Sequence, residues 1–346
     1  MQSKVMPKFS RLNNSYSRQN GVALVIVIWI LSLLTLMAGS FAMSMRRESS
    51  VSMALIDSAK ALAMAESGII LAEYNLSQPD TKQRWVADGS IYELERPNGW
   101  IRIRIFSESG KVDINASSET QLMAVVAAVT DDSWEQQRLV NAILDWRDED
   151  DDTRTLGAER KQYQQARLPY EPSNNAFQSL EELQLVLGFN EAIYNTLQPW
   201  LTIYSGEAEV NVDQAAPELL AVLAKDMERR QISDEALKNR LDSRNQQGQD
   251  QLDSQDDEET AADAAFVGEN QTYTIIVEVK NEDEAAAGVE VVVKYQENED
   301  GSPFEILDWK QYLQNPQGQN GLSLFDEALD HLVITVQDEF RYDDNH

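Results

Sequence analysis

Residues 22–45 constrain this chain more than any other segment, because these 24 consecutive residues, VALVIVIWILSLLTLMAGSFAMSM, carry no charge. A helix of this length reaches about 36 Å, enough to cross the hydrocarbon core of a bilayer. The preceding residues include Lys4, Lys8, Arg11 and Arg18 and no acid. Basic flanks stay in the cytoplasm. We therefore expect one membrane-spanning helix, with a cytoplasmic N-terminus and everything after Arg46 outside.

The helical pattern continues past the membrane. Residues 51–76 keep good helix formers, with apolar residues at helical spacing and only Gly68 as an interruption. We expect one helix from about residue 22 to residue 76, whose second half is amphipathic and packs on a folded domain. Two simpler interpretations of the apolar run remain open, namely a signal anchor and a secretory signal cleaved near Ser40-Phe41-Ala42.

The sequence after the predicted membrane segment indicates an α+β fold. Alternating residues in Ser90–Arg96 and Trp100–Phe106 predict a β-hairpin. Further strands are predicted at Tyr273–Lys280, Val289–Tyr295, Phe304–Trp309 and within Leu332–Phe340. A long helical stretch separates the two groups, so we expect the long helix on an antiparallel sheet, with an all-α domain inserted into that sheet. The predicted boundaries are 46–112 and 272–346 for the sheet domain, 113–271 for the insert, and about 245–271 for a disordered acidic loop within it.

Charge and composition exclude several functions. With 29 Lys and Arg against 59 Asp and Glu, the net charge is −30, which argues against a nucleic-acid partner. The chain has no cysteine, so disulfides and thiol catalysis are excluded. Its two histidines are His331 and His346, and no nucleophile motif or phosphate loop is present. We predict that the protein is not an enzyme.

The strongest chemical signal is an acidic cluster. Residues 145–152 contain six acids, namely Asp145, Asp148, Glu149, Asp150, Asp151 and Asp152. Asp148, Asp150, Asp152 and Glu159 match positions 1, 3, 5 and 12 of a calcium loop. Thr153 stands where an EF-hand needs glycine, so a true EF-hand is not expected. Another oxygen-rich calcium loop remains open, as does a solvated acidic turn whose charges Arg147 and Arg154 balance locally.

The basic leader that ends at Gly21, followed by Val22 and an uncharged helix, resembles type IV prepilins and the pseudopilins of type II secretion. Most of these proteins have glutamate as the fifth residue after cleavage, and here that residue is Ile26. This departure is typical of the minor pseudopilin K family. The stretch LDWRDEDDD, with GAE and SLEELQLVLG downstream, resembles the signature of the same family, whose members can bind calcium.

The resemblance implies the following expectations. A prepilin peptidase cuts between Gly21 and Val22 and methylates the new amine, and the helix lies in the inner membrane with a periplasmic soluble domain. The subunit initiates and caps the pseudopilus with minor pseudopilins I and J, and through them contacts H and the major pseudopilin G. Calcium is the expected cofactor. Two alternatives remain, namely a minor or tip pilin of a type IV pilus and a signal-anchored periplasmic calcium-binding module.

Overall fold

The computed structural model describes residues 20–80, 83–97, 99–230, 271–281, 286–296, 303–313 and 323–336. Most of the predicted leader and all but the last residue of the predicted acidic loop 245–271 lie outside these ranges. Residues 1–56 and 57–346 form two compact units.

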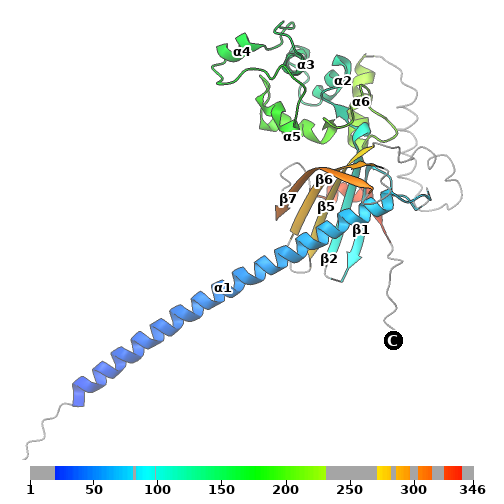
Figure 1. Ribbon diagram of the computed structural model, residues 1–346. Coiled ribbons are helices and arrows are strands. Elements are labelled where there is room, and N and C mark those ends of the chain that lie inside the picture. The colour runs from blue at the N-terminus through cyan, green and yellow to red at the C-terminus, as the bar shows by residue number, and fades with distance from the viewer. Residues whose placement is uncertain are drawn as a thin grey trace, which may run out of the picture. The chain divides into compact units, whose positions relative to one another are not determined.

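Helix α1 (Asn20–Leu76) is continuous over 57 residues, which confirms the predicted long helix (Figure 1). Its apolar side chains between Val22 and Ile56 are exposed. Among the described residues, this is the one helix that is long and apolar enough to cross a membrane. The first half of α1 therefore has the properties of a membrane anchor.

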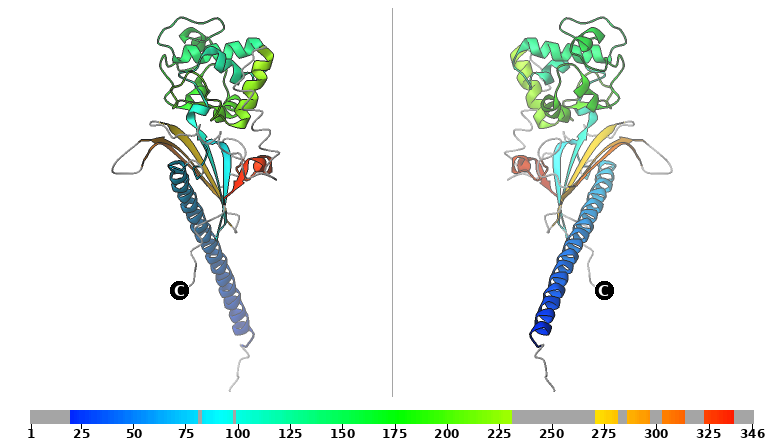
Figure 2. Two further views of the ribbon diagram at one scale, coloured as in Figure 1. Left: turned by 90° about the vertical axis from the view of Figure 1, so that its right-hand side faces the viewer. Right: turned by 90° about the vertical axis from the view of Figure 1, so that its left-hand side faces the viewer.

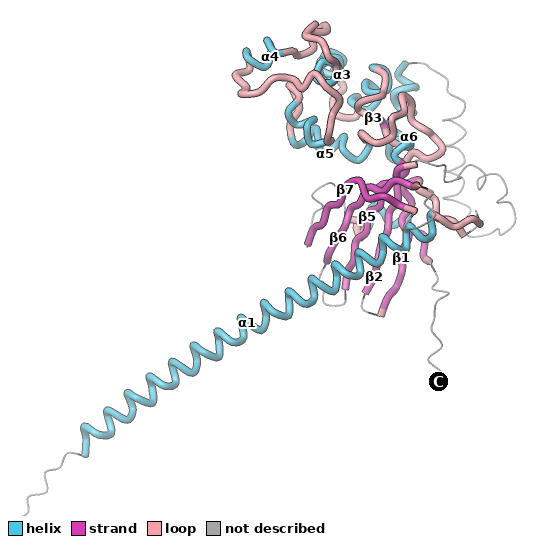
Figure 3. Tube along the Cα trace, in the orientation of Figure 1, coloured by secondary structure: helices cyan, strands magenta, loops and turns pink. Residues whose placement is uncertain are grey.

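A six-stranded sheet forms the centre of the second unit (Figure 3). Its strands are β1 (Asp88–Arg96), β2 (Gly99–Ser107), β5 (Thr272–Asn281), β6 (Ala286–Tyr295), β7 (Phe304–Leu313) and β8 (Val333–Thr335). Their order is β7-β6-β5-β2-β1-β8. The predicted hairpin and the three predicted downstream strands are confirmed.

The expectation of a wholly antiparallel sheet was wrong for one strand. The pairs from β7 to β1 are antiparallel, but β8 pairs with β1 in parallel. The chain leaves β7 at one edge of the sheet and adds β8 at the other edge. A hairpin cannot make that connection, and a crossover permits parallel pairing.

The second half of α1 packs on one face of the sheet (Figure 2). Its buried residues follow helical spacing and are mostly small: Ala61, Ala65, Ile69, Ala72 and Leu76. They share one core with alternate residues of the strands, including Ile101, Ile103, Ile105 and Val277. Gly68 marks the closest approach, because a Cβ there would lie 2.7 Å from Val277 Cγ1. Apolar residues that alternate along the strands and small residues on one side of α1 together form the core between helix and sheet.

The insert lies between β2 and β5 in the chain. Its helices are α2 (Glu119–Val126), α3 (Ser133–Arg147), α4 (Arg160–Gln165), α5 (Glu191–Leu197) and α6 (Pro217–Arg230), with 3₁₀ turns η1 (Glu108–Gly110), η2 (Leu180–Leu185) and η3 (Gln198–Trp200). These elements have their own core, centred on residues such as Leu139, Ile143 and Tyr163. A short parallel ladder of β3 (Val112–Asp113) and β4 (Leu201–Thr202) was not predicted, because two residues give no periodic signal.

Candidate functional site

Helix α3 delivers the first acid of the acidic cluster into the core of the insert. Asp132 caps its N-terminus by accepting a hydrogen bond of 3.0 Å from Trp134 N. The last two turns bury Ile143 and Trp146 against the insert core. Asp145 lies on this buried side and is 0% exposed. A carboxylate is therefore held where water is excluded.

The loop after α3 folds back over Asp145. Arg154 Nη1 lies 2.9 Å from Asp145 Oδ1, and Arg154 N donates to both carboxylate oxygens at 3.4 and 3.3 Å. A Cβ at Gly157 would lie 2.1 Å from Asp145 Oδ2, so only glycine permits this approach. Burial raises the pKa of Asp145, while Arg154 acts in the opposite direction.

Glu159 is the second buried acid, with 2% of its surface exposed. It precedes α4, and the Gln162 backbone faces its side chain in a capping-box arrangement. Among the described residues, however, no donor forms a hydrogen bond with either Glu159 carboxylate oxygen. Burial, followed by the nearby charges of Asp145 and Asp148, raises the pKa of Glu159 to about 7. The Gln162 backbone thus lies near this carboxylate without satisfying it.

Two further buried oxygens in this region also lack donors. Asp148 Oδ2 contacts Arg154 Nη1, but Asp148 Oδ1 has no partner. Asn174 donates from Nδ2 to Asp150 O at 2.9 Å and to Asp151 Oδ1 at 3.1 Å, and its Oδ1 has no partner. Unsatisfied carboxylate and amide oxygens are the ligands that calcium prefers.

The four predicted ligands fall into two groups. Glu159 is buried and Asp148 is half-buried, whereas Asp150 and Asp152 are exposed. Asp150 Oδ1 accepts a hydrogen bond of 2.8 Å from Asp152 N, which fixes the loop. Sequence reasoning did not place Asp145 among the ligands, although its spacing on α3 could have shown that it faces inward.

The predicted local charge balance rests on one arginine. Arg147 donates instead to the carbonyl oxygens of Ile114 and Ser117, and burial lowers its pKa. Arg154 pairs with Asp145 and Asp148. Within the described ranges, no three Asp, Glu or His side chains are already gathered as an ion-holding group. The carboxylate and amide oxygens of Asp148, Glu159 and Asn174 that lack donors are of the kind that binds a hard cation. In this conformation the positive charge beside Asp145 and Asp148 comes from Arg154.

The predicted processing residues lie at the start of α1. Gly21 and Val22 fall in its first turn, which begins at Asn20. The side chains of Val22 and Ile26 are 67% and 52% exposed, so no described part of this chain covers them.

Comparisons with known proteins agree with one another. Residues 103–206, which include the acidic cluster, match the family model for type II secretion system (T2SS), protein K. A type II secretion system protein K from Klebsiella pneumoniae is 27% identical over 230 residues, covering 60% of this chain and 70% of that protein. The Pseudomonas aeruginosa protein of the same name is 26% identical over 229 residues, covering 59% and 68%.

Among solved structures, the fold is similar to a chain in the crystal structure of the GspK-GspI-GspJ complex from the enterotoxigenic Escherichia coli type 2 secretion system. The TM-score is 0.48 at 16% identity, covering 77% of this chain and 98% of that chain.

Proposed function

We propose that this chain, which is similar to type II secretion system protein K, is a minor pseudopilin at the tip of the pseudopilus. There it initiates and caps the filament that exports folded proteins across the outer membrane. The family match over residues 103–206 is the observation that carries the proposal. The role is structural, and the subunit has no reaction of its own.

The N-terminal half of α1 supports the proposed route into the filament. A prepilin peptidase cuts between Gly21 and Val22 and methylates the new amine. The apolar helix then holds the subunit in the inner membrane, and the sheet and insert lie in the periplasm. The basic residues before the helix favour this orientation.

Ile26 supports a position with no preceding subunit. An unpaired carboxylate in a bilayer costs several kcal/mol. In pilins the fifth residue is a glutamate, which meets the N-terminal ammonium of a neighbouring subunit. A first subunit has no such neighbour, so an apolar Ile26 avoids that cost. The large insert between β2 and β5 also suits a tip, because a wide head does not fit within a helical stack.

Calcium is proposed as a structural cofactor of the acidic cluster. Asp148 and Glu159 would hold it, with Asp145 and Asn174 as additional ligands, because four oxygens of Asp148, Glu159 and Asn174 are buried and have no hydrogen-bond donor among the described residues. Asp150 and Asp152 remain candidates that would have to turn inward. A bound ion would supply the positive charge that Glu159 lacks.

The proposed partners are minor pseudopilins I and J, and through them H and the major pseudopilin G. The face of α1 that points away from the sheet is available to them, since Ile70 and Tyr74 there are 68% and 55% exposed. We expect this face of the helix to be covered in the complex, with the insert left free.

The test is assembly of the full-length chain, in detergent, with pseudopilins I and J of the same secretion system. The mass of the complex, measured by light scattering, should equal the sum of one copy of this chain, one of pseudopilin I and one of pseudopilin J. Ile70→Lys should weaken the complex, whereas Trp134→Lys, which changes another exposed apolar residue, on the insert helix α3, should leave it intact. Failure to assemble at tens of micromolar would contradict the assignment. Calcium binding without assembly would instead favour a membrane-anchored calcium-binding module.

A further inference from the structure

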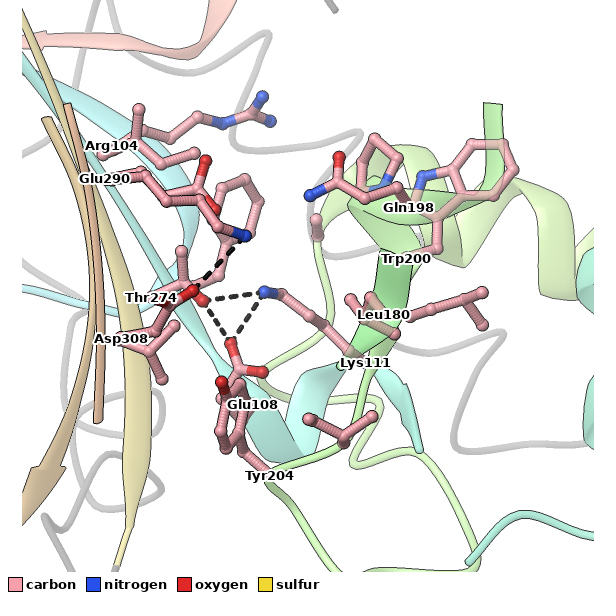
Figure 4. Close-up of a pocket in the computed structure, with 18 of the residues that line it drawn as sticks. Arg104, Glu108, Lys111, Leu180, Gln198, Trp200, Tyr204, Thr274, Glu290 and Asp308 are labelled. Carbon is pink, nitrogen blue, oxygen red and sulfur yellow. Dashed lines mark hydrogen bonds and ion pairs between the residues drawn. The ribbon is translucent and has the colours of Figure 1, made fainter. Parts of the chain in front are cut away.

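A cavity of about 870 Å³ lies between the sheet and the insert, within residues 57–346. Strands β2, β5, β6 and β7 supply one wall, and η2, α5 and η3 supply the other. Figure 4 shows Arg104 and Glu290 on the sheet side, opposite Leu180, Gln198 and Trp200 of the insert. The volume of this cavity is typical of sites for small organic ligands.

The three basic residues in the cavity lining are already neutralised. Arg104 Nη2 lies 2.6 Å from Glu218 Oε1, Lys111 Nζ lies 2.7 Å from Glu108 Oε1, and Lys310 Nζ lies 3.0 Å from Glu181 Oε1. Each of these basic side chains is therefore paired with a carboxylate of the protein. An anionic ligand would have to displace one of these carboxylates to reach a positive charge.

Two acceptors in the same lining have no donor. The half-buried Glu290 carboxylate, on β6, makes no hydrogen bond or ion pair with any described residue. Burial raises its pKa, and the more distant charges of Lys111 and Lys310 oppose that rise. Glu218 uses Oε1 for Arg104, but its Oε2 is buried without a hydrogen-bond partner. A buried acceptor that is left unsatisfied, as Glu218 Oε2 is, destabilises the folded state. Both deficits would be met by a ligand that donates hydrogen bonds and carries a positive charge.

The remaining lining is suited to a hydrocarbon chain. Leu180, Ile203, Val292 and Leu307 are apolar, and Tyr194, Trp200 and Tyr204 add aromatic rings. The Phe106 ring is already covered by cations of the protein itself, with Arg104 Cζ at 4.7 Å and Lys111 Nζ at 5.4 Å from its centroid. The free aromatic and apolar surface would contact an aliphatic stem while its charged end reaches a carboxylate.

We propose that this cavity binds a primary ammonium group on an aliphatic stem, with Glu290 as its counter-ion and Glu218 Oε2 as a second acceptor. The group could belong to a free alkyl amine or to a lysine side chain of a peptide. The inference does not depend on the proposed filament role.

Isothermal titration of the full-length chain in detergent, with saturating calcium present, tests the proposal. The probes are 1,5-diaminopentane, 1-pentanol as a neutral analogue, and a blocked tripeptide with a central lysine. The variants are Glu290→Gln and the matched control Glu95→Gln, an exposed glutamate on β1 of the same sheet. Thermal melts verify that both variants fold.

We expect the diamine to bind, the alcohol to bind at least about tenfold more weakly, and Glu290→Gln to lose about tenfold in diamine affinity while Glu95→Gln does not. Tighter binding of the tripeptide would identify a lysine side chain as the source, and tighter binding of the diamine would identify a free amine. Equal binding of amine and alcohol, no binding of either amine probe, or equal diamine affinity in the two variants would overturn the proposal.

Discussion

The guanidinium Nη1 of Arg154 lies 2.9 Å from the buried Asp145 carboxylate, so the acidic cluster already contains one internal cation. That cation also contacts Asp148, and no charge remains for Glu159, whose two carboxylate oxygens lack donors. Arg154 therefore neutralises only part of the acidic cluster. The unmatched part is where calcium would act.

Calcium should stabilise the protein through Glu159. At 100 times the dissociation constant, a ligand that binds only the folded state adds about 2.7 kcal/mol. We expect the melting temperature to rise with calcium relative to chelator, and Glu159→Gln to remove most of that rise. Glu149→Gln, which changes an exposed acid of the same loop that is not a candidate ligand, should keep most of it. Melts that are the same with calcium and with chelator would leave the acidic cluster as a structural turn balanced by Arg154.

Without calcium, stability should depend on pH through the same residue. The folded-state pKa of Glu159 is raised to about 7 from an ordinary 4.5. The folded state thus holds this proton more tightly than the unfolded state, and the free energy of unfolding should fall as pH rises from about 4.5 to 7. We expect a loss of about 1 kcal/mol after solvent screening, measured by urea unfolding in chelator. Glu159→Gln should flatten this part of the profile, and an unchanged slope would show that other groups cause it.

Gly68 should be required for the contact between α1 and the sheet. A Cβ there would lie 2.7 Å from Val277 Cγ1, a stiff β-branched side chain. Overpacking costs about 1–3 kcal/mol, and alanine recovers about 1 kcal/mol of helix propensity. We expect Gly68→Ala to lower the free energy of unfolding by about 1 kcal/mol. Gly39→Ala in the same helix, where nothing lies within 4 Å, should cause no loss. Equal stability of both variants would mean that the sheet adjusts freely.

The sequence predicted those parts of the fold that have local periodic signals. Ile101, Ile103 and Ile105 alternate, and α1 keeps helical spacing across Gly68, so both elements were expected. Strand β8 was placed within a predicted strand, but its parallel pairing with β1 depends on a crossover that no local pattern encodes.

The site was predicted only in part, for the same reason. The spacing of Asp148 and Glu159 identified one residue that the structure buries, Glu159, and one that it leaves half-buried, Asp148. Asn174 lies 22 residues after Asp152 in the chain, and its contact with the acidic loop joins two segments that no local pattern connects. Arg154 was expected to balance charge locally, and its pairing with Asp145 and Asp148 confirms this. The cavity beside Glu290 joins strands and insert that are distant in sequence, so no motif could indicate it.

Processing at Gly21 should determine the mature N-terminus. A bulky charged residue before the cleaved bond should block a prepilin peptidase, so Gly21→Glu should leave the leader attached. Intact mass of the purified protein would show a wild-type chain starting at Val22 and a variant that keeps residues before it. Gly39→Ala, a glycine change farther along α1, should be processed normally. A wild-type chain that starts at Met1 or at Met43 would contradict the pilin-like assignment.

The position of the subunit in the filament tests the central claim most directly. Pseudopili would be assembled in cells that carry a tagged copy of this chain, and the tag would be located by immunogold electron microscopy. We predict one gold cluster at a single end of each filament. Ile26→Glu should reduce the fraction of labelled ends, because its carboxylate would lie in the bilayer without a neighbouring ammonium, whereas Ile26→Leu should not. Label along the whole filament length would contradict the tip assignment.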